Sequence, residues 1–277
     1  NDMTIIFDKS PQGSEEWLAA RKGAITGSKA KVARERLADK PAKVDKKTGE
    51  ILEQAKRGGY TAKAMLYAYD CAREREGGTV MPQFQNGAMR FGSEQEEHAI
   101  RAYEARTGYL VERMGFCHTN DRKFGVSVDG DPDPDGLIEV KTMVSSETLF
   151  TAFVDGDISE YRDQCLMGMW LLTRKWCDVV LWAPDMPDPL RVIRIERNEE
   201  EIDALVADLL EFDKTVEALR LKLSAVIGTS MAEYDADLFP PEPVETVDKL
   251  DALTQMETVP PTPPLNTKPA ALATPDF

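Results

Sequence analysis

At 277 residues the chain is long enough for one substantial α/β core or for two small ones. It contains no run of about 18 apolar residues and no signal-peptide pattern, so we expect a cytoplasmic protein without a membrane-spanning segment. The net charge of −15 argues at first sight against a nucleic-acid partner, although residues 29–57 carry ten Lys and Arg against five Asp and Glu.

The four cysteines form no CxxC pair, and the chain has only two histidines. A zinc or iron–sulfur site is therefore not expected, and reduced, buried thiols are. With so little histidine, acid–base chemistry falls to carboxylates and lysines.

The first part of the chain predicts a short helix and a candidate phosphate site. Residues 15–22 have acids in the first turn and bases in the last, after Ser14 as a cap. Ser28 lies where a second helix begins. Its hydroxyl and the free backbone amides there can bind a phosphate, with Arg21 as counter-charge. Simple helix capping by Ser28 is an equally open interpretation.

Residues 37–59 are polar and rich in lysine, and they predict a loop or mobile insertion able to touch a DNA backbone, unless they are only a solvated loop. Helices are expected over residues 61–76 and 85–107, followed by a strand over 109–117. The second helix carries several acids, one of which can serve as a metal ligand.

Two apolar, β-branched runs in residues 124–141 surround a turn rich in Asp and Pro, which predicts a β-hairpin. Side chains alternate along a strand, so Glu139 and Lys141 share one face, and hairpin pairing would bring Asp129 close to Glu139. Crowded carboxylates need a cation, and oxygen ligands suit Mg²⁺ or Mn²⁺. A solvated acidic turn is the alternative. A calcium loop is not expected, because Thr142 stands at the position that requires Glu.

The remaining elements are a helix over residues 159–175, strands over 178–183 and 190–195, and a long helix over 199–226 that either covers the sheet or joins a neighbouring subunit. Gln164 is a polar residue beside an apolar helix face, and is either a site contact or a satisfied core amide. Residues 229–277 hold nine prolines and a net charge of −7, which predicts a disordered or partner-binding tail after a domain at residues 1–228. The basic insertion lies at about residues 38–59 of that domain.

Four motifs between residues 17 and 183 resemble the phage-type recombination exonucleases related to lambda exonuclease and the YqaJ group, within the PD-(D/E)XK nuclease superfamily. They begin at Trp17, Gly92, Ser127 and Tyr161, in family order and with closely kept spacing. The chain departs from the family in having Val128 where Pro is frequent, and in its lysine-rich insertion and Pro-rich tail.

The resemblance implies an α/β fold, with a PD-(D/E)XK core whose central mixed β-sheet is flanked by helices. It implies site roles as follows: Glu96, Asp129 and Glu139 as metal ligands together with the Val140 carbonyl, Lys141 as the catalytic lysine, Gln164 completing the site, and Arg21 with Ser28 binding the 5′ phosphate. One or two Mg²⁺ ions, or Mn²⁺, would be bound.

The implied activity is 5′-to-3′ degradation of one strand of double-stranded DNA, leaving 3′ overhangs for phage-type recombination by strand annealing. A trimeric ring around DNA, a single-strand annealing protein as partner, and a phage or prophage origin are implied as well. The alternatives are another nuclease of the superfamily, such as an endonuclease or a RecB-like helper nuclease, and a DNA-end-binding scaffold without turnover.

Overall fold

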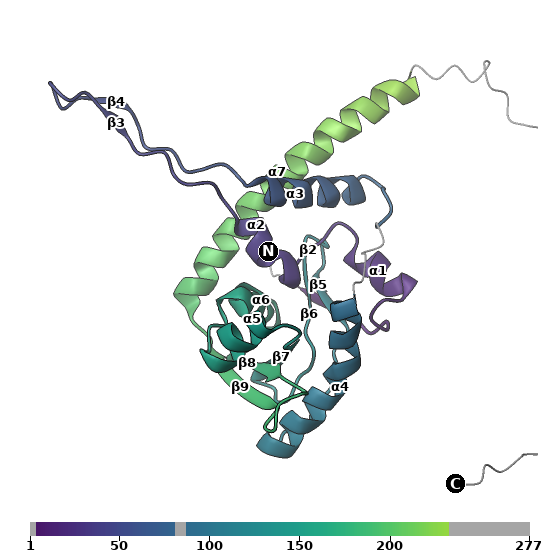
Figure 1. Ribbon diagram of the computed structural model, residues 1–277. Coiled ribbons are helices and arrows are strands. Elements are labelled where there is room, and N and C mark those ends of the chain that lie inside the picture. The colour runs from purple at the N-terminus through teal and green to yellow at the C-terminus, as the bar shows by residue number, and fades with distance from the viewer. Residues whose placement is uncertain (1–3, 81–86, 233–277) are drawn as a thin grey trace, which may run out of the picture. The chain divides into compact units, whose positions relative to one another are not determined.

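A computed structural model describes residues 4–80 and 87–232. The predicted tail and the start of the helix expected from residue 85 lie partly outside the described residues. Two sheets and the helices around them form the core of the fold (Figure 1). Within residues 4–80 and 87–232, we find no helix with the length and apolar character that crossing a bilayer demands.

The first sheet contains four strands in the order β1-β5-β6-β2. Strand β5 pairs antiparallel with both β1 and β6, and β2 pairs parallel with β6. The strands are Ile5–Asp8 (β1), Ile25–Thr26 (β2), Phe116–Thr119 (β5) and Phe124–Ser127 (β6).

The second sheet is mixed and carries the central part of the predicted site. Its order is β7-β8-β9, with Gly136–Thr142 (β7) parallel to Trp176–Trp182 (β8), and Leu190–Glu196 (β9) antiparallel to β8. Every residue of β8 is buried, as expected for the central strand of a covered sheet. Strand β7 lies at the end of this strand order and is therefore an edge strand.

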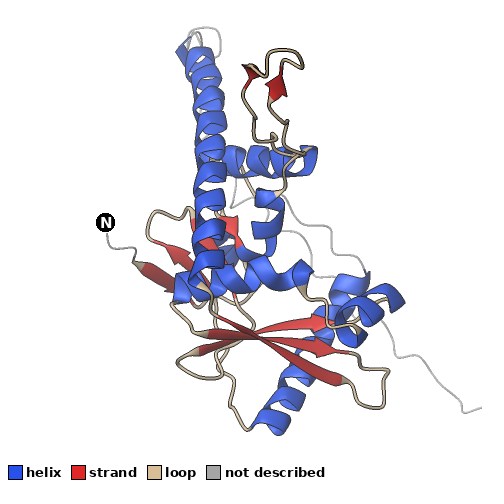
Figure 2. Ribbon diagram, turned by 90° about the vertical axis from the view of Figure 1, so that its left-hand side faces the viewer, coloured by secondary structure: helices blue, strands red, loops and turns tan. Residues whose placement is uncertain are grey.

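Helices cover both faces of this second sheet (Figure 2). On one face, α4 (Gly87–Thr107) packs Ala99, Ile100 and Tyr103 against Ile138 and Val140 of β7. On the other face, α6 (Ser159–Leu172) packs against Leu137 of β7 and against β8. Alternation along β7 thus turns Glu139 and Lys141 toward the α6 side.

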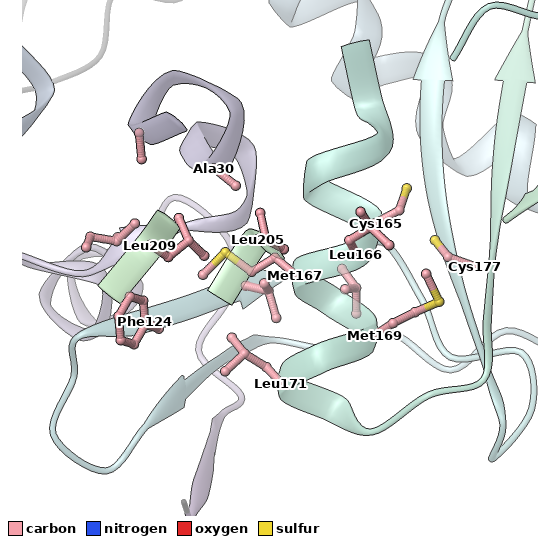
Figure 3. Close-up of a cluster of buried hydrophobic side chains, with 14 of the residues drawn as sticks. Ala30, Phe124, Cys165, Leu166, Met167, Met169, Leu171, Cys177, Leu205 and Leu209 are labelled. Carbon is pink, nitrogen blue, oxygen red and sulfur yellow. The ribbon is translucent and has the colours of Figure 1, made fainter. Parts of the chain in front are cut away.

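The largest hydrophobic core lies where α6 meets β6 and the long helix α7 (Glu199–Ala232), as Figure 3 shows. Leu205, Leu209 and Phe212 of α7 are fully buried there. The first half of α7 therefore packs into the domain, whereas Leu221, Val226 and Ile227 farther along are exposed.

The other helices are short or lie at the periphery. Ser14 caps α1 as predicted, since its Oγ accepts a hydrogen bond from the Trp17 amide at 3.2 Å. The bounds are Glu15–Arg21 (α1), Gly27–Lys29 (η1, a 3₁₀ turn), Ala30–Arg34 (α2), Ala62–Arg75 (α3), Ser146–Thr148 (α5) and Leu149–Val154 (η2, a π-helical turn).

Two predictions of local structure were wrong. Strands β6 and β7 do not form a hairpin, because they belong to different sheets and are joined only by an antiparallel bridge between Gly130 and Ile138. The strand expected over residues 109–117 is mostly irregular, and β5 starts at Phe116. Residues 37–59, predicted as a loop or mobile insertion, project from the core and contain a short hairpin with strands Lys43–Val44 (β3) and Ile51–Glu53 (β4); this segment is here called the basic hairpin (Figure 1).

Candidate active site

The predicted site residues gather along the open edge of β7. Glu139 is 4% exposed and projects from β7 toward α6, where Gln164 lies. The Glu139 Oε1 atom accepts hydrogen bonds from Lys141 Nζ at 2.8 Å and from Gln164 Nε2 at 2.5 Å. Lys141 Nζ also donates to Gln164 Oε1 at 3.2 Å. These three side chains therefore form one closed hydrogen-bonded cluster.

Asp129 reaches the same edge from the end of the first sheet, two residues beyond β6. Its Oδ2 atom accepts a hydrogen bond from the Val140 amide at 2.6 Å. Asp129 is thus held beside Glu139 by its carboxylate and not by ladder pairing. The N–H and C=O groups of one strand residue point to the same side, so the Val140 carbonyl also faces this open edge.

Glu96 approaches from α4, on the opposite face of the sheet. Its carboxylate accepts a hydrogen bond from Arg113 Nη1, and the same nitrogen donates to the Asp129 backbone carbonyl at 3.1 Å. Arg113 therefore links Glu96 directly to Asp129, another candidate metal ligand.

The three carboxylates influence one another electrostatically. Burial, together with the negative charges of Glu139 and Glu96, raises the pKa of Asp129 well above its usual range. Burial also raises the pKa of Glu139, against the opposing charge of Lys141. The charges of Glu139 and Asp129 outweigh the burial of Lys141 and raise the pKa of its ammonium, which stays protonated.

The chemistry of the candidate ligands fits a hard divalent cation, but their side chains do not converge on one point. Carboxylate and carbonyl oxygens are the ligands that Mg²⁺ and Mn²⁺ prefer, and crowded like charges favour a cation between them. In the described part of the chain, however, no three His, Cys, Asp or Glu side chains converge closely enough to ligate one ion. The Glu96 carboxylate is engaged by Arg113 instead.

The predicted phosphate-binding residues lie beside this edge. Arg21, at the end of α1, stacks its guanidinium 4.2 Å from the Trp17 ring centroid and places Nη1 3.4 Å from Ser127 Oγ, two residues before Asp129. Burial lowers the pKa of Arg21. The contacts with Trp17 and Ser127 hold the guanidinium charge close to the end of β6.

Ser28 lies in the 3₁₀ turn η1, and its Oγ is 3.5 Å from Thr26 Oγ1. The turn packs against α6 so closely that a Cβ on Gly27 would stand 3.6 Å from the Gln164 side chain. The Ser28 segment and the Glu139 cluster are therefore neighbours, joined through α6.

Sequence reasoning missed Arg113, and it quoted Tyr161 without giving it a role. The Lys141 ammonium lies 5.3 Å from the Tyr161 ring centroid, a cation–π contact on the α6 side. Tyr161 precedes Gln164 by three residues on one helix, a spacing that could have placed both near the lysine. No comparable signal marked Arg113, which lies in an irregular segment.

The architecture around this edge is a mixed sheet with a carboxylate–lysine strand at its margin, an acidic residue entering from the segment that follows β6, and helices on both faces (Figure 2). That arrangement is the core of the PD-(D/E)XK nuclease superfamily. Residues 16–175 match the family model described as the YqaJ-like viral recombinase domain. Because the match spans more than half of its length, the chain belongs to this family.

Solved structures support the same fold. The alkaline exonuclease LHK-Exo from Laribacter hongkongensis is 28% identical, with a TM-score of 0.63 over 78% of this chain and 100% of that chain. LHK-Exo in complex with dAMP is 27% identical, with a TM-score of 0.64 over the same shares. A phage related exonuclease from Haemophilus somnus 129PT shares the fold at 16% identity, with a TM-score of 0.53 over 74% of this chain and 96% of that chain. A search of curated proteins found no match.

Proposed function

We propose that this chain is a divalent-metal-dependent exonuclease that degrades one strand of duplex DNA from its 5′ end and leaves a 3′ single-stranded overhang. The observation that carries the proposal is the closed cluster of Glu139, Lys141 and Gln164 beside Asp129, on the edge strand of a YqaJ-family fold. The similarity to LHK-Exo, solved also in complex with dAMP, supports a nuclease that handles deoxynucleotides.

The ion would be held by Asp129, Glu139 and the Val140 carbonyl, with Glu96 joining them. A Mg²⁺ or Mn²⁺ ion held by these residues would supply Lewis-acid polarisation of a phosphoryl oxygen and would lower the pKa of a bound water. Lys141 keeps its proton, and its ammonium beside Glu139 would stabilise the negative charge that develops on the scissile phosphate. Gln164 fixes Lys141 and Glu139 in their shared orientation through its two hydrogen bonds.

Arg21 and Ser28 supply the preference for a 5′ phosphate in this proposal. The Arg21 guanidinium is restrained by Trp17 and Ser127 and offers further donors for a terminal phosphate. Because the turn that carries Ser28 packs against α6, a phosphate bound there would lie next to the Glu139 cluster. A degraded end would thus be gripped a short distance from the bond that is cut.

We further propose that the chain acts in phage-type recombination, delivering 3′ overhangs to a single-strand annealing protein. A trimeric ring with the basic residues toward DNA would reconcile the net charge of −15 with an acidic substrate. The basic hairpin projects from the core in Figure 1, which suits contact with duplex beyond the site.

The test uses end-labelled linear duplex, with and without a 5′ phosphate, beside a covalently closed circle of the same sequence. With Mg²⁺ we expect progressive digestion of the phosphorylated linear duplex, an intact circle, and no digestion once chelator is added. Cutting of the closed circle would replace the exonuclease by an endonuclease. Glu139→Ala protein that binds DNA ends yet digests them like the unaltered protein would remove this site from the chemistry altogether.

A further inference from the structure

Arg113 contacts two of the candidate site residues, Glu96 and Asp129. Its backbone position is fixed, because the neighbouring Glu112 and Asp131 form an antiparallel bridge with N–O distances of 3.0 and 2.9 Å. This bridge holds the irregular segment before β5 against the turn that follows Asp129. The guanidinium is therefore directed at the acidic edge by a constrained backbone.

The contacts of Arg113 are all with acceptors of the acidic edge. Nη1 donates to the Glu96 carboxylate and to the Asp129 carbonyl, the latter at 3.1 Å, while Nη2 lies 3.5 Å from Glu97 Oε2. The hydrogen bond with Glu96 and the charges of Glu96, Glu97 and Asp129 outweigh partial burial and raise the pKa of Arg113. The negative charge of Glu96 is thereby paired with a guanidinium that also contacts the backbone of Asp129.

The charges of the site explain why a cation belongs at this position. Glu96, Asp129 and Glu139 are three acidic groups, and Lys141 can compensate only one negative charge. Arg113 compensates a second, and it does so on the side of the site opposite Lys141. A divalent ion bound between the carboxylates would compensate both of the charges that Lys141 leaves, so the ion and Arg113 serve the same electrostatic need.

We propose that Arg113 competes with the divalent ion for Glu96: the guanidinium holds this carboxylate when the site is metal-free, and metal binding draws the carboxylate away from it. The inference rests on the proposed function, since it assumes that Asp129 and Glu139 bind the ion. It assigns Arg113 as a positioning residue that keeps the metal-free site from repelling itself. The same contact weakens metal affinity, because every binding event must break the Arg113–Glu96 pair.

The experiment measures binding of Mn²⁺ alone to the full chain, by titration calorimetry and by loss of the free-ion electron paramagnetic resonance signal, without DNA. Arg113→Gln removes the competing charge. Arg101→Gln is the matched control, because Arg101 lies on α4, pairs with the neighbouring Glu97 at 3.0 Å, and is replaced with the same charge change. We expect Arg113→Gln to bind Mn²⁺ about three- to tenfold more tightly, and Arg101→Gln to stay within about twofold of the unaltered chain.

The melting temperature, measured with and without Mn²⁺, is a second readout. It distinguishes competition with the ion from a purely structural role of Arg113. In chelator, Arg113→Gln should melt at a lower temperature than the unaltered chain, and saturating Mn²⁺ should raise its melting temperature by more than it raises that of either comparator. Arg113→Lys keeps the charge with a single donor group and should give an intermediate Mn²⁺ affinity.

Several results would overturn the inference. Equal tightening in both Gln variants would mean a general effect of charge, and weaker binding in Arg113→Gln would mean that the arginine helps to present Glu96 to the ion. Both results leave the proposed function standing if the unaltered chain binds Mn²⁺ and loses it on Glu139→Gln substitution. Absence of Glu139-dependent binding in every variant would overturn the proposed function, and this inference with it.

Discussion

Replacement of Lys141 by Met tests the centre of the site, because it keeps the length of the side chain and removes its charge. The Glu139 side chain is 5% exposed and would lose the ammonium that lies 2.8 Å from its Oε1 atom, keeping only the Gln164 hydrogen bond. Loss of a charge-assisted hydrogen bond to a buried carboxylate costs about 2–3 kcal/mol of unfolding free energy.

In a domain of this size that loss lowers the melting temperature by about 4–12 °C. Part of it should return on addition of Mg²⁺, because a bound ion stabilises the ionised form of Glu139. DNA digestion should fall by about 10²- to 10⁴-fold at saturating Mg²⁺, since the group that stabilises charge on the scissile phosphate is gone.

Lys123→Met is the matched control for this experiment. Lys123 Nζ lies 2.9 Å from Oδ2 of the buried Asp213, a pair of similar geometry outside the site. Asp213 keeps its ion pair with Arg75 at 2.6 Å, so we expect a smaller loss of about 1 kcal/mol and digestion within about threefold of normal. The mechanism is refuted if Lys141→Met digests DNA within tenfold of the unaltered protein while its stability falls as expected.

Three further predictions concern the phosphate site, the basic hairpin and the charge of the metal-free site. Arg21→Ala should raise the KM for 5′-phosphorylated duplex ends by about tenfold and leave 5′-hydroxyl ends nearly unaffected, and equal effects on both ends would remove Arg21 from phosphate recognition. Lys46 and Lys47 are exposed at the turn of the basic hairpin, and their substitution by Glu should weaken duplex binding. The slope of log K against log salt concentration should become shallower by about one for each DNA phosphate that the hairpin no longer neutralises. The same change at the exposed Lys214 and Lys222 of α7 should have neither effect. In chelator, the raised pKa of Asp129 means that the native state holds this proton more strongly than the unfolded chain. The stabilising contribution of this proton is therefore complete below the unfolded pKa of 3.8 and is lost as pH rises through the native pKa. Asp129→Asn should abolish this fall in unfolding free energy, and Mg²⁺ should suppress it.

The sequence by itself determined the elements whose physics is local. Apolar spacing located α3, α4, α6 and α7 to within a few residues at most ends, and the Ser14 cap was readable because capping involves only neighbours in the chain. Strand alternation likewise placed Glu139 and Lys141 on one face, where the structure joins them at 2.8 Å. Burial was less certain from the sequence than helix position, since the apolar Phe91 of α4 is 40% exposed.

Tertiary structure decided how separate segments meet. Pairing of strands depends on hydrogen bonds between distant residues, so the sequence could not show that β6 and β7 separate into two sheets. Asp129 still reaches Glu139, but through its own carboxylate on the Val140 amide. The hold of Arg113 on Glu96 belongs to the same category, because it arises only when an irregular segment is fixed beside a helix that precedes it in the chain.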